Sequence, residues 1–132
     1  MSNELILEVF FIKIKIKGNL KNITENTNDI IDTKAIKNKN KINFYDKDTI
    51  YKITIYEKQI ILVRDNKEFS HKFIFDIDNI TKSEYYIKEI NTTIEMPIKT
   101  NKLNISDSSI KIEYEIIDNN NKYSYILDME WI

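Results

Sequence analysis

The chain has 132 residues, enough for one domain whose hydrophobic core needs no covalent cross-links. It contains no cysteine, which excludes disulfides and thiolate metal sites, and its 20 basic residues nearly balance its 21 acidic residues. This balance gives no overall field toward nucleic acid or a membrane surface, so we expect neither as a partner. We find no targeting segment and no apolar run long enough to span a bilayer, and therefore expect a cytoplasmic protein.

The first predicted strand covers residues 5–17. In its second half Ile12, Ile14 and Ile16 alternate with lysines, the period of two that is typical of a strand with one buried face. The first half is apolar on both faces except for Glu8, and such a change predicts a bend or bulge of the kind found in barrel strands. We expect the glycine at position 18 to end this strand.

Residues 19–34 are polar and weakly patterned. They predict a loop followed by a strand over residues 30–36, with a short helix as the alternative. From residue 41 onward the pattern is regular, and polar turns separate the next predicted strands, which cover residues 42–45, 49–57, 59–64, 68–77, 84–90 and 93–99. Pro97 cannot donate a hydrogen bond to a neighbouring strand, which predicts an edge-like or bulged position.

The last part of the chain predicts a long antiparallel hairpin. Its two arms surround a turn at residues 118–121, and on each arm one face is apolar: Ile110, Ile112, Tyr114 and Ile116 on the first, and Tyr123, Tyr125, Leu127, Met129 and Trp131 on the second. We expect the second arm to pair with the first strand of the chain and Trp131 to be buried. Because the chain has a single glycine, we expect Asn and Asp to adopt the left-handed backbone conformation in its turns.

These elements predict an all-β protein. The short connections favour an up-and-down meander, and eight to ten sequential antiparallel strands tend to close on themselves because closure removes exposed edges. We therefore predict one antiparallel β-barrel domain over residues 1–132.

Residues from Ile60 to Trp131 carry a resemblance to a known family. The run Ile60, Ile61, Leu62, Val63, Arg64, the following strand through His71, Lys72 and Phe73, and then Tyr86, the turn at Asn91 and the segment Ile110, Ile112, Tyr114 resemble the YwiB-like family of small uncharacterised bacterial proteins. The resemblance implies a bacterial protein with a lipocalin-like (calycin-type) β-barrel and brings no established activity. Asn91 stands where relatives have a turn glycine, and the segment after it is longer by one residue, which affects the local register.

Candidate ligand-binding residues are polar side chains on predicted inward faces. They are Tyr51, Arg64, His71, Tyr114, Tyr123 and Tyr125. A partly polar interior of this kind suits a small amphipathic molecule, since a barrel of about eight strands can hold one small ligand. The alternatives are a core histidine, an exposed or acid-paired arginine, and tyrosine rings that fill the interior with their hydroxyls at the rim.

Motifs for catalysis are lacking. With one glycine, one histidine and no cysteine the chain has no phosphate loop, no paired-histidine metal motif and no thiol nucleophile, so we expect no catalytic residue, no metal and no cofactor. The leading hypothesis is a non-enzymatic protein that binds a small apolar or amphipathic ligand at the barrel mouth. The alternative is a solid barrel that binds a protein or forms a homodimer, for instance near residues 5–11. An enzyme with His71 as its acid/base is the third hypothesis.

Overall fold

The computed structural model describes residues 11–132, which form a closed barrel of ten antiparallel strands in sequential order. The strands are β1 (Phe11–Asn22), β2 (Thr27–Asn38), β3 (Lys41–Asp46), β4 (Thr49–Ile55), β5 (Gln59–Asp65), β6 (Phe69–Asp76), β7 (Thr81–Ile87), β8 (Thr92–Ile105), β9 (Ser109–Asp118) and β10 (Asn121–Trp131). The last strand, β10, pairs with β1 and closes the barrel. The predictions of an all-β meander barrel and of this closure are confirmed. Residues 5–10 of the first predicted strand lie outside the described part.

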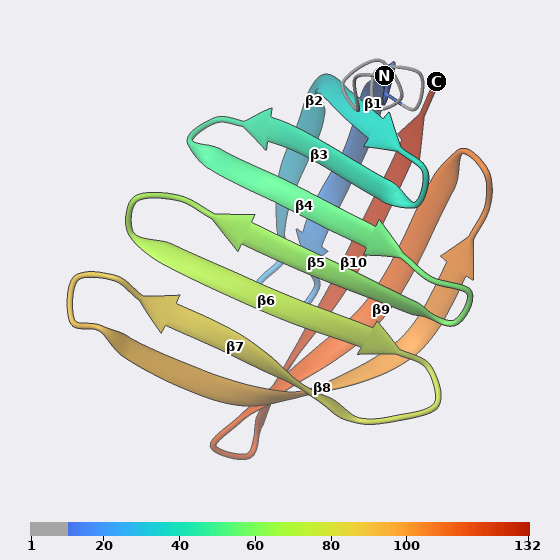
Figure 1. Ribbon diagram of the computed structural model, residues 1–132. Helices are drawn as coiled ribbons and strands as arrows, with labels where there is room; N and C mark the ends of the chain where they lie inside the picture. Colours follow the sequence, from blue (N-terminus) through green and yellow to red (C-terminus); the bar gives the residue numbers. More distant parts are fainter. Residues whose placement is uncertain (1–10) are drawn as a thin grey trace, which may run out of the picture.

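The barrel is flattened into two layers that cross (Figure 1). Strands β3–β7 lie side by side in one layer, and β1, β2, β9 and β10 form the other. The layers are joined at two corners. At one of them β2 pairs with β3 only over Ala35–Asn38, and at the other β8 pairs with β7 up to Ile98 and with β9 from Ile98 onward. Pro97 therefore lies beyond the β9 ladder, in the edge-like position expected of it.

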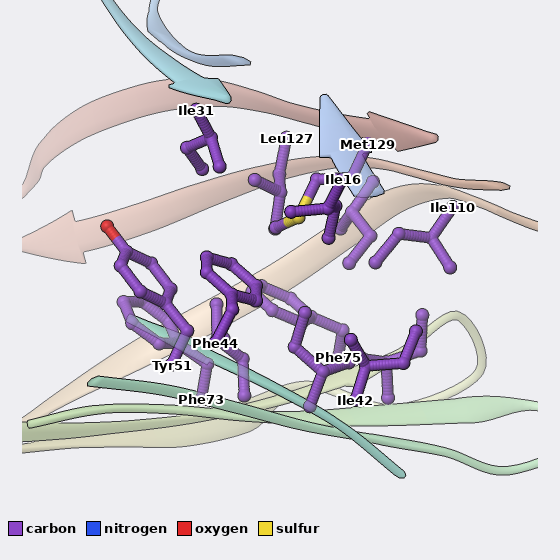
Figure 2. Close-up of a cluster of buried hydrophobic side chains, with 14 of the residues drawn as sticks. Ile16, Ile31, Ile42, Phe44, Tyr51, Phe73, Phe75, Ile110, Leu127 and Met129 are labelled. Atoms are coloured by element: carbon purple, nitrogen blue, oxygen red, sulfur yellow. The ribbon is translucent and has the colours of Figure 1, made fainter. Parts of the chain in front are cut away.

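The up-and-down order places the connections at two opposite ends of the barrel. We call the end with the β1–β2, β3–β4, β5–β6, β7–β8 and β9–β10 turns the mouth end, and the end with the other four turns and the carboxyl terminus the closed end. Aliphatic and aromatic side chains from both layers fill the interior toward the closed end (Figure 2), among them Ile16, Ile42, Ile60, Phe75, Ile110 and Met129, each at most 1% exposed. This packed core contributes most of the hydrophobic stabilisation of the fold.

Trp131 fixes the closing strand to the rest of the barrel. Its side chain is buried, its indole Nε1 donates a hydrogen bond to the carbonyl of Asp107 (3.1 Å), and its backbone N–H donates one to the carbonyl of Ser108 (2.8 Å). The next residue, Ile132, exchanges two backbone hydrogen bonds with Lys15 of β1, both 3.1 Å long. The expected burial of Trp131 is confirmed.

Gly18 does not end the first strand, contrary to the prediction. Strand β1 continues to Asn22, and Gly18 lies in the ladder opposite Met129 of β10. A Cβ atom at this position would lie 2.3 Å from the carbonyl oxygen of Asp128 and 2.9 Å from the Cα of Met129. The glycine is therefore needed for the close approach of β1 and β10, and its φ is not positive.

Other boundaries also differ from the sequence prediction. The loop expected between residue 19 and the strand over residues 30–36 is mostly wrong, since β1 extends to Asn22 and β2 begins at Thr27, whereas the strand itself is confirmed as part of β2. Strand β7 begins and ends three residues earlier than predicted. Strand β8 continues past residue 99 to Ile105, because a bulge between Thr100 and Lys102 restores its pairing with β9.

Asparagines take the left-handed positions, as expected from the scarcity of glycine. Asn26, Asn91, Asn119 and Asn120 have positive φ values. Lys39 and Lys47 do so as well, which the composition did not indicate.

Candidate functional site

Four inward side chains form one row across strands β4, β5, β6 and β7. Tyr51 of β4 pairs directly with Arg64 of β5, Arg64 with His71 of β6, and His71 with Tyr85 of β7. The row follows from the period of two in each strand, because these residues share a face with buried apolar neighbours such as Leu62. It places the only arginine and the only histidine of the chain side by side.

Arg64 lies among aromatic rings. Its Cζ is 5.4 Å from the centre of the Tyr51 ring and 5.9 Å from that of Phe69, both within cation–π range. Within residues 11–132 no carboxylate forms an ion pair with it, and its buried Nε has no hydrogen-bond partner. A guanidinium has five N–H donors in a planar fork, so this group keeps its donors available for an anionic oxygen.

His71 lies behind Arg64 and is only 7% exposed. Its ring packs against Phe73 (centroids 3.9 Å apart) and edge-on against Tyr85 (5.0 Å), and its buried Nε2 has no hydrogen-bond partner in the described chain. Burial, reinforced by the charge of Arg64, lowers the pKa of His71 to about 4. The imidazole is therefore neutral near pH 7 and leaves Arg64 as the positive charge of the row.

Tyr114 and Tyr125 approach the row from the other layer. Their rings stack at 5.1 Å, and Tyr114 also contacts Phe75 (4.7 Å) and Phe73 (5.9 Å). Burial raises the pKa of both phenols, and the positive charge of Arg64 opposes this rise in each case. Both hydroxyls remain protonated at neutral pH and can donate hydrogen bonds toward the interior.

Tyr123 stands apart from the other candidates. It pairs with Ile116 near the β9–β10 turn and is half-buried, but no ring contact within the described residues joins it to the aromatic cluster. The structure thus brings Tyr51, Arg64, His71, Tyr114 and Tyr125 together and leaves Tyr123 at the margin.

A pocket of about 280 Å³ opens at the mouth end in front of Arg64. Its lining includes Tyr51, Arg64 and Phe69 together with polar and charged residues of the turns and of the neighbouring strand ends, namely Asp29, Asp46, Lys47, Asp48, Thr49, Asn66 and Glu68. Arg64 and Tyr51 therefore border the pocket, whereas His71 does not line it.

The β5–β6 turn holds one wall of this pocket. The side-chain oxygen of Asn66 accepts hydrogen bonds from the backbone N–H groups of Glu68 (2.9 Å) and Phe69 (3.0 Å), and its amide donates to Thr49 (3.2 Å). Lys88 fixes the turn from the neighbouring hairpin by donating to Asp65 (2.7 Å) and to the Asn66 carbonyl (2.6 Å). These bonds position Phe69 against Arg64 before any ligand arrives.

Sequence reasoning missed several residues of the site. Asp46, Thr49 and Asn66 line the pocket, but they were interpreted only as turn residues or strand ends. Their spacing was a usable signal, because residues two apart in a strand share a face of the sheet. Asp46 is two residues from the inward Phe44, and Asn66 is two residues from the inward Arg64. Tyr85 lies within the strand predicted over residues 84–90 but was not included among the inward candidates.

A larger groove, of about 690 Å³, lies against β1, β2 and β3. Its side chains include Lys13, Lys34, Ile36 and Tyr45, which are exposed on the outer surface of the barrel. Among residues 11–132, no buried polar atom without a partner lines this groove, in contrast to the mouth pocket with Arg64. The mouth pocket is therefore the stronger candidate for a small-molecule site.

The described residues contain neither a metal-binding group of side chains nor a membrane-spanning helix. Across residues 11–132 no three histidine, aspartate or glutamate side chains gather closely enough to hold a metal ion. The same part of the chain contains no helix long and apolar enough to cross a membrane.

Comparison with known proteins finds a likeness in fold. No protein-family model and no curated protein matches the chain. Among solved structures, the crystal structure of the YwiB protein from Bacillus subtilis matches 92% of this chain and 91% of its own length with a TM-score of 0.64, at 13% sequence identity. The chain is therefore similar in fold to YwiB, as the resemblance of its strand and turn pattern implied.

Proposed function

We propose that this protein is a lipocalin-like, non-enzymatic binding protein that takes a small amphipathic acid at the mouth of its barrel. The observation that carries the proposal is Arg64, a half-buried guanidinium without an acidic partner among residues 11–132 that lines an open pocket. The carboxylate of the ligand would bind the guanidinium, and its apolar body would lie against Phe69 and Tyr51. The pocket volume of about 280 Å³ suits a body of about one aromatic ring.

The surrounding side chains support binding rather than catalysis. His71 is neutral near pH 7, and Tyr51, Tyr114 and Tyr125 offer hydroxyl groups without a reactive partner. A bidentate contact between arginine and a carboxylate fixes orientation as well as affinity. The interior would thus select a molecule by one charged end and one flat apolar surface.

A titration with two isosteric probes tests this proposal. We expect 4-methylbenzoate to shift the backbone amide NMR signals of residues 64–69 in ¹⁵N-labelled protein, and its uncharged analogue 4-methylbenzamide to have little effect. Arg64→Gln should weaken the binding of 4-methylbenzoate at least tenfold. Lys72→Gln removes one positive charge from the outer face of the adjacent strand and should leave the titration unchanged.

Two results would contradict the proposal. Equal binding of the benzoate and the benzamide would show that the charge of Arg64 does not select the ligand. Unchanged binding by Arg64→Gln would place the probe elsewhere on the protein.

A second candidate function rests on the outer groove over β1, β2 and β3. Ile36 (47% exposed) and Tyr45 (59% exposed) form an apolar surface there between lysines. Such a surface suits a protein partner or a second copy of the chain. Native mass spectrometry of the protein purified from cells separates the candidates, because the mouth site predicts a co-purified small molecule on a monomer and the outer groove predicts a dimer or a complex.

A further inference from the structure

The mouth pocket contains a second unpaired charge, the carboxylate of Asp46. Asp46 ends β3 on the same face as Ile42 and Phe44, both buried, and it is half-buried itself. No hydrogen bond or ion pair within residues 11–132 engages it. The nearby ammonium of Lys47 binds Asp29 on β2, which is the main cause of its raised pKa, and the charge of Asp46 contributes to this rise without a direct contact.

Asp46 and Arg64 thus line one pocket with opposite charges that do not pair with each other. Their strands, β3 and β5, lie about 10 Å apart because β4 separates them, and Asp46 is two residues nearer the β3–β4 turn than the pair formed by Tyr51 and Arg64. Tyr51 stacks on Phe44 at 4.6 Å, and Asp46 follows Phe44 on the same face of β3, so an aromatic surface connects the two charges. Opposite charges at the two ends of an aromatic surface match a molecule that carries both signs of charge.

We infer that the ligand of the mouth pocket is zwitterionic, with a carboxylate on Arg64 and an ammonium group on Asp46. The inference rests on the proposed function and specifies its ligand class. It also explains the excess of acids in the pocket lining, where repulsion by Asp46, Asp48 and Glu68 partly offsets the attraction of Arg64 for a simple anion. An ammonium group at the outer end of the ligand turns this repulsion into attraction.

The test compares 4-(aminomethyl)benzoate with 4-methylbenzoate, which has the same ring and carboxylate but no ammonium group. We expect the aminomethyl compound to bind the native protein at least tenfold more tightly in the same NMR titration. Asp46→Asn should reduce this ratio of dissociation constants to less than about two. The matched control, Asp32→Asn, removes the same charge from an exposed position of β2 outside the pocket and should preserve most of the preference.

Each outcome bears on one of the two proposals. If 4-methylbenzoate binds and the ammonium group adds no affinity, the zwitterion is wrong while the acid-binding pocket stands. A preference that persists in Asp46→Asn would also overturn the role of Asp46. If neither compound binds, both the zwitterion and the acid-binding pocket are wrong.

Discussion

The two ends of the barrel are built on opposite principles. At the closed end Ile42, Ile60 and Phe75 are fully buried, and the last strand is held by Trp131. The buried polar atoms without a partner at this end, Asn38 Oδ1 and Ser83 Oγ, belong to uncharged side chains. At the mouth end Arg64 and His71 occupy equivalent inward positions, yet each has a buried nitrogen without a hydrogen-bond partner in the described chain. A buried polar atom left unpaired costs about 1–3 kcal/mol, so the mouth is less stable than an apolar filling would be.

This difference indicates a division of labour within one sheet. Native proteins place unsatisfied polar groups where a function requires them and compensate for their cost elsewhere. Here the same ten strands supply both regions. The closed end should therefore determine the stability of the fold, and the mouth should tolerate substitution with little loss of stability but with a loss of binding.

The largest effect is expected at the closed end. Removal of Trp131 and Ile132 eliminates a buried indole, its hydrogen bond to Asp107 and both backbone hydrogen bonds to Lys15. We expect a loss of about 4 kcal/mol or more in the free energy of unfolding, measured by urea denaturation. Removal of Ile132 alone, which is 98% exposed, should cost much less. An unchanged midpoint in the double truncation would mean that closure by β10 does not stabilise the barrel.

The next effect is a pH dependence of the free energy of unfolding that His71 causes at the mouth end. The pKa of His71 is about 4 in the folded protein and 6.5 in the unfolded chain, so the unfolded state binds the proton first as the pH falls. The stability contribution is therefore fully present above pH 6.5 and is lost between about pH 6.5 and 4, by at most about 3 kcal/mol. Urea midpoints of the native protein and of His71→Leu across this range provide the measurement. Carboxylates titrate in both proteins, so parallel profiles would rule out the burial of a neutral histidine.

A smaller effect is expected at Gly18, where the neighbouring strands β1 and β10 approach closely. In Gly18→Ala the new Cβ would lie 2.3 Å from the Asp128 carbonyl oxygen and 2.8 Å from Met129 Cγ, and one of the two strands must move. We expect a loss of about 1–3 kcal/mol by urea denaturation. Lys21→Ala on the exposed face of the same strand is the control. Equal stability of the two variants would show that the approach of β1 and β10 is not tight.

Much of this comparison was accessible from the sequence. Alternation of apolar and polar residues predicts the strands and their inward faces, and it correctly oriented Tyr51, Arg64 and His71. Closure was predictable because sequential short connections leave two edges that can satisfy each other. Which residues share a face depends only on their spacing along the strand, so errors in the predicted ends of a strand do not change this assignment.

The remaining features depend on partners that are distant in sequence. Gly18 was interpreted as a terminator because its reason, the backbone of Asp128, is supplied by β10. The pocket could not be predicted because its lining comes from β2 and from the β3–β4 and β5–β6 hairpins, whose relative positions no local pattern specifies. The absence of a partner for Arg64 is likewise a property of its surroundings, since Asp65 next to it in sequence binds Lys88 instead.

The smallest effect on stability provides the sharpest test of the division between the two ends. Arg64→Met retains a long unbranched side chain for packing between Tyr51 and Phe69 and removes a buried nitrogen that has no partner. Because the cation–π contacts contribute only about 0.5–1 kcal/mol at such sites and removal of the orphaned donor offsets them, we expect the free energy of unfolding to change by less than about 1 kcal/mol. The same variant should lose the binding of 4-methylbenzoate. A large destabilisation would mean that Arg64 is a structural element of the barrel, and the argument for a ligand at the mouth would then lose its main support.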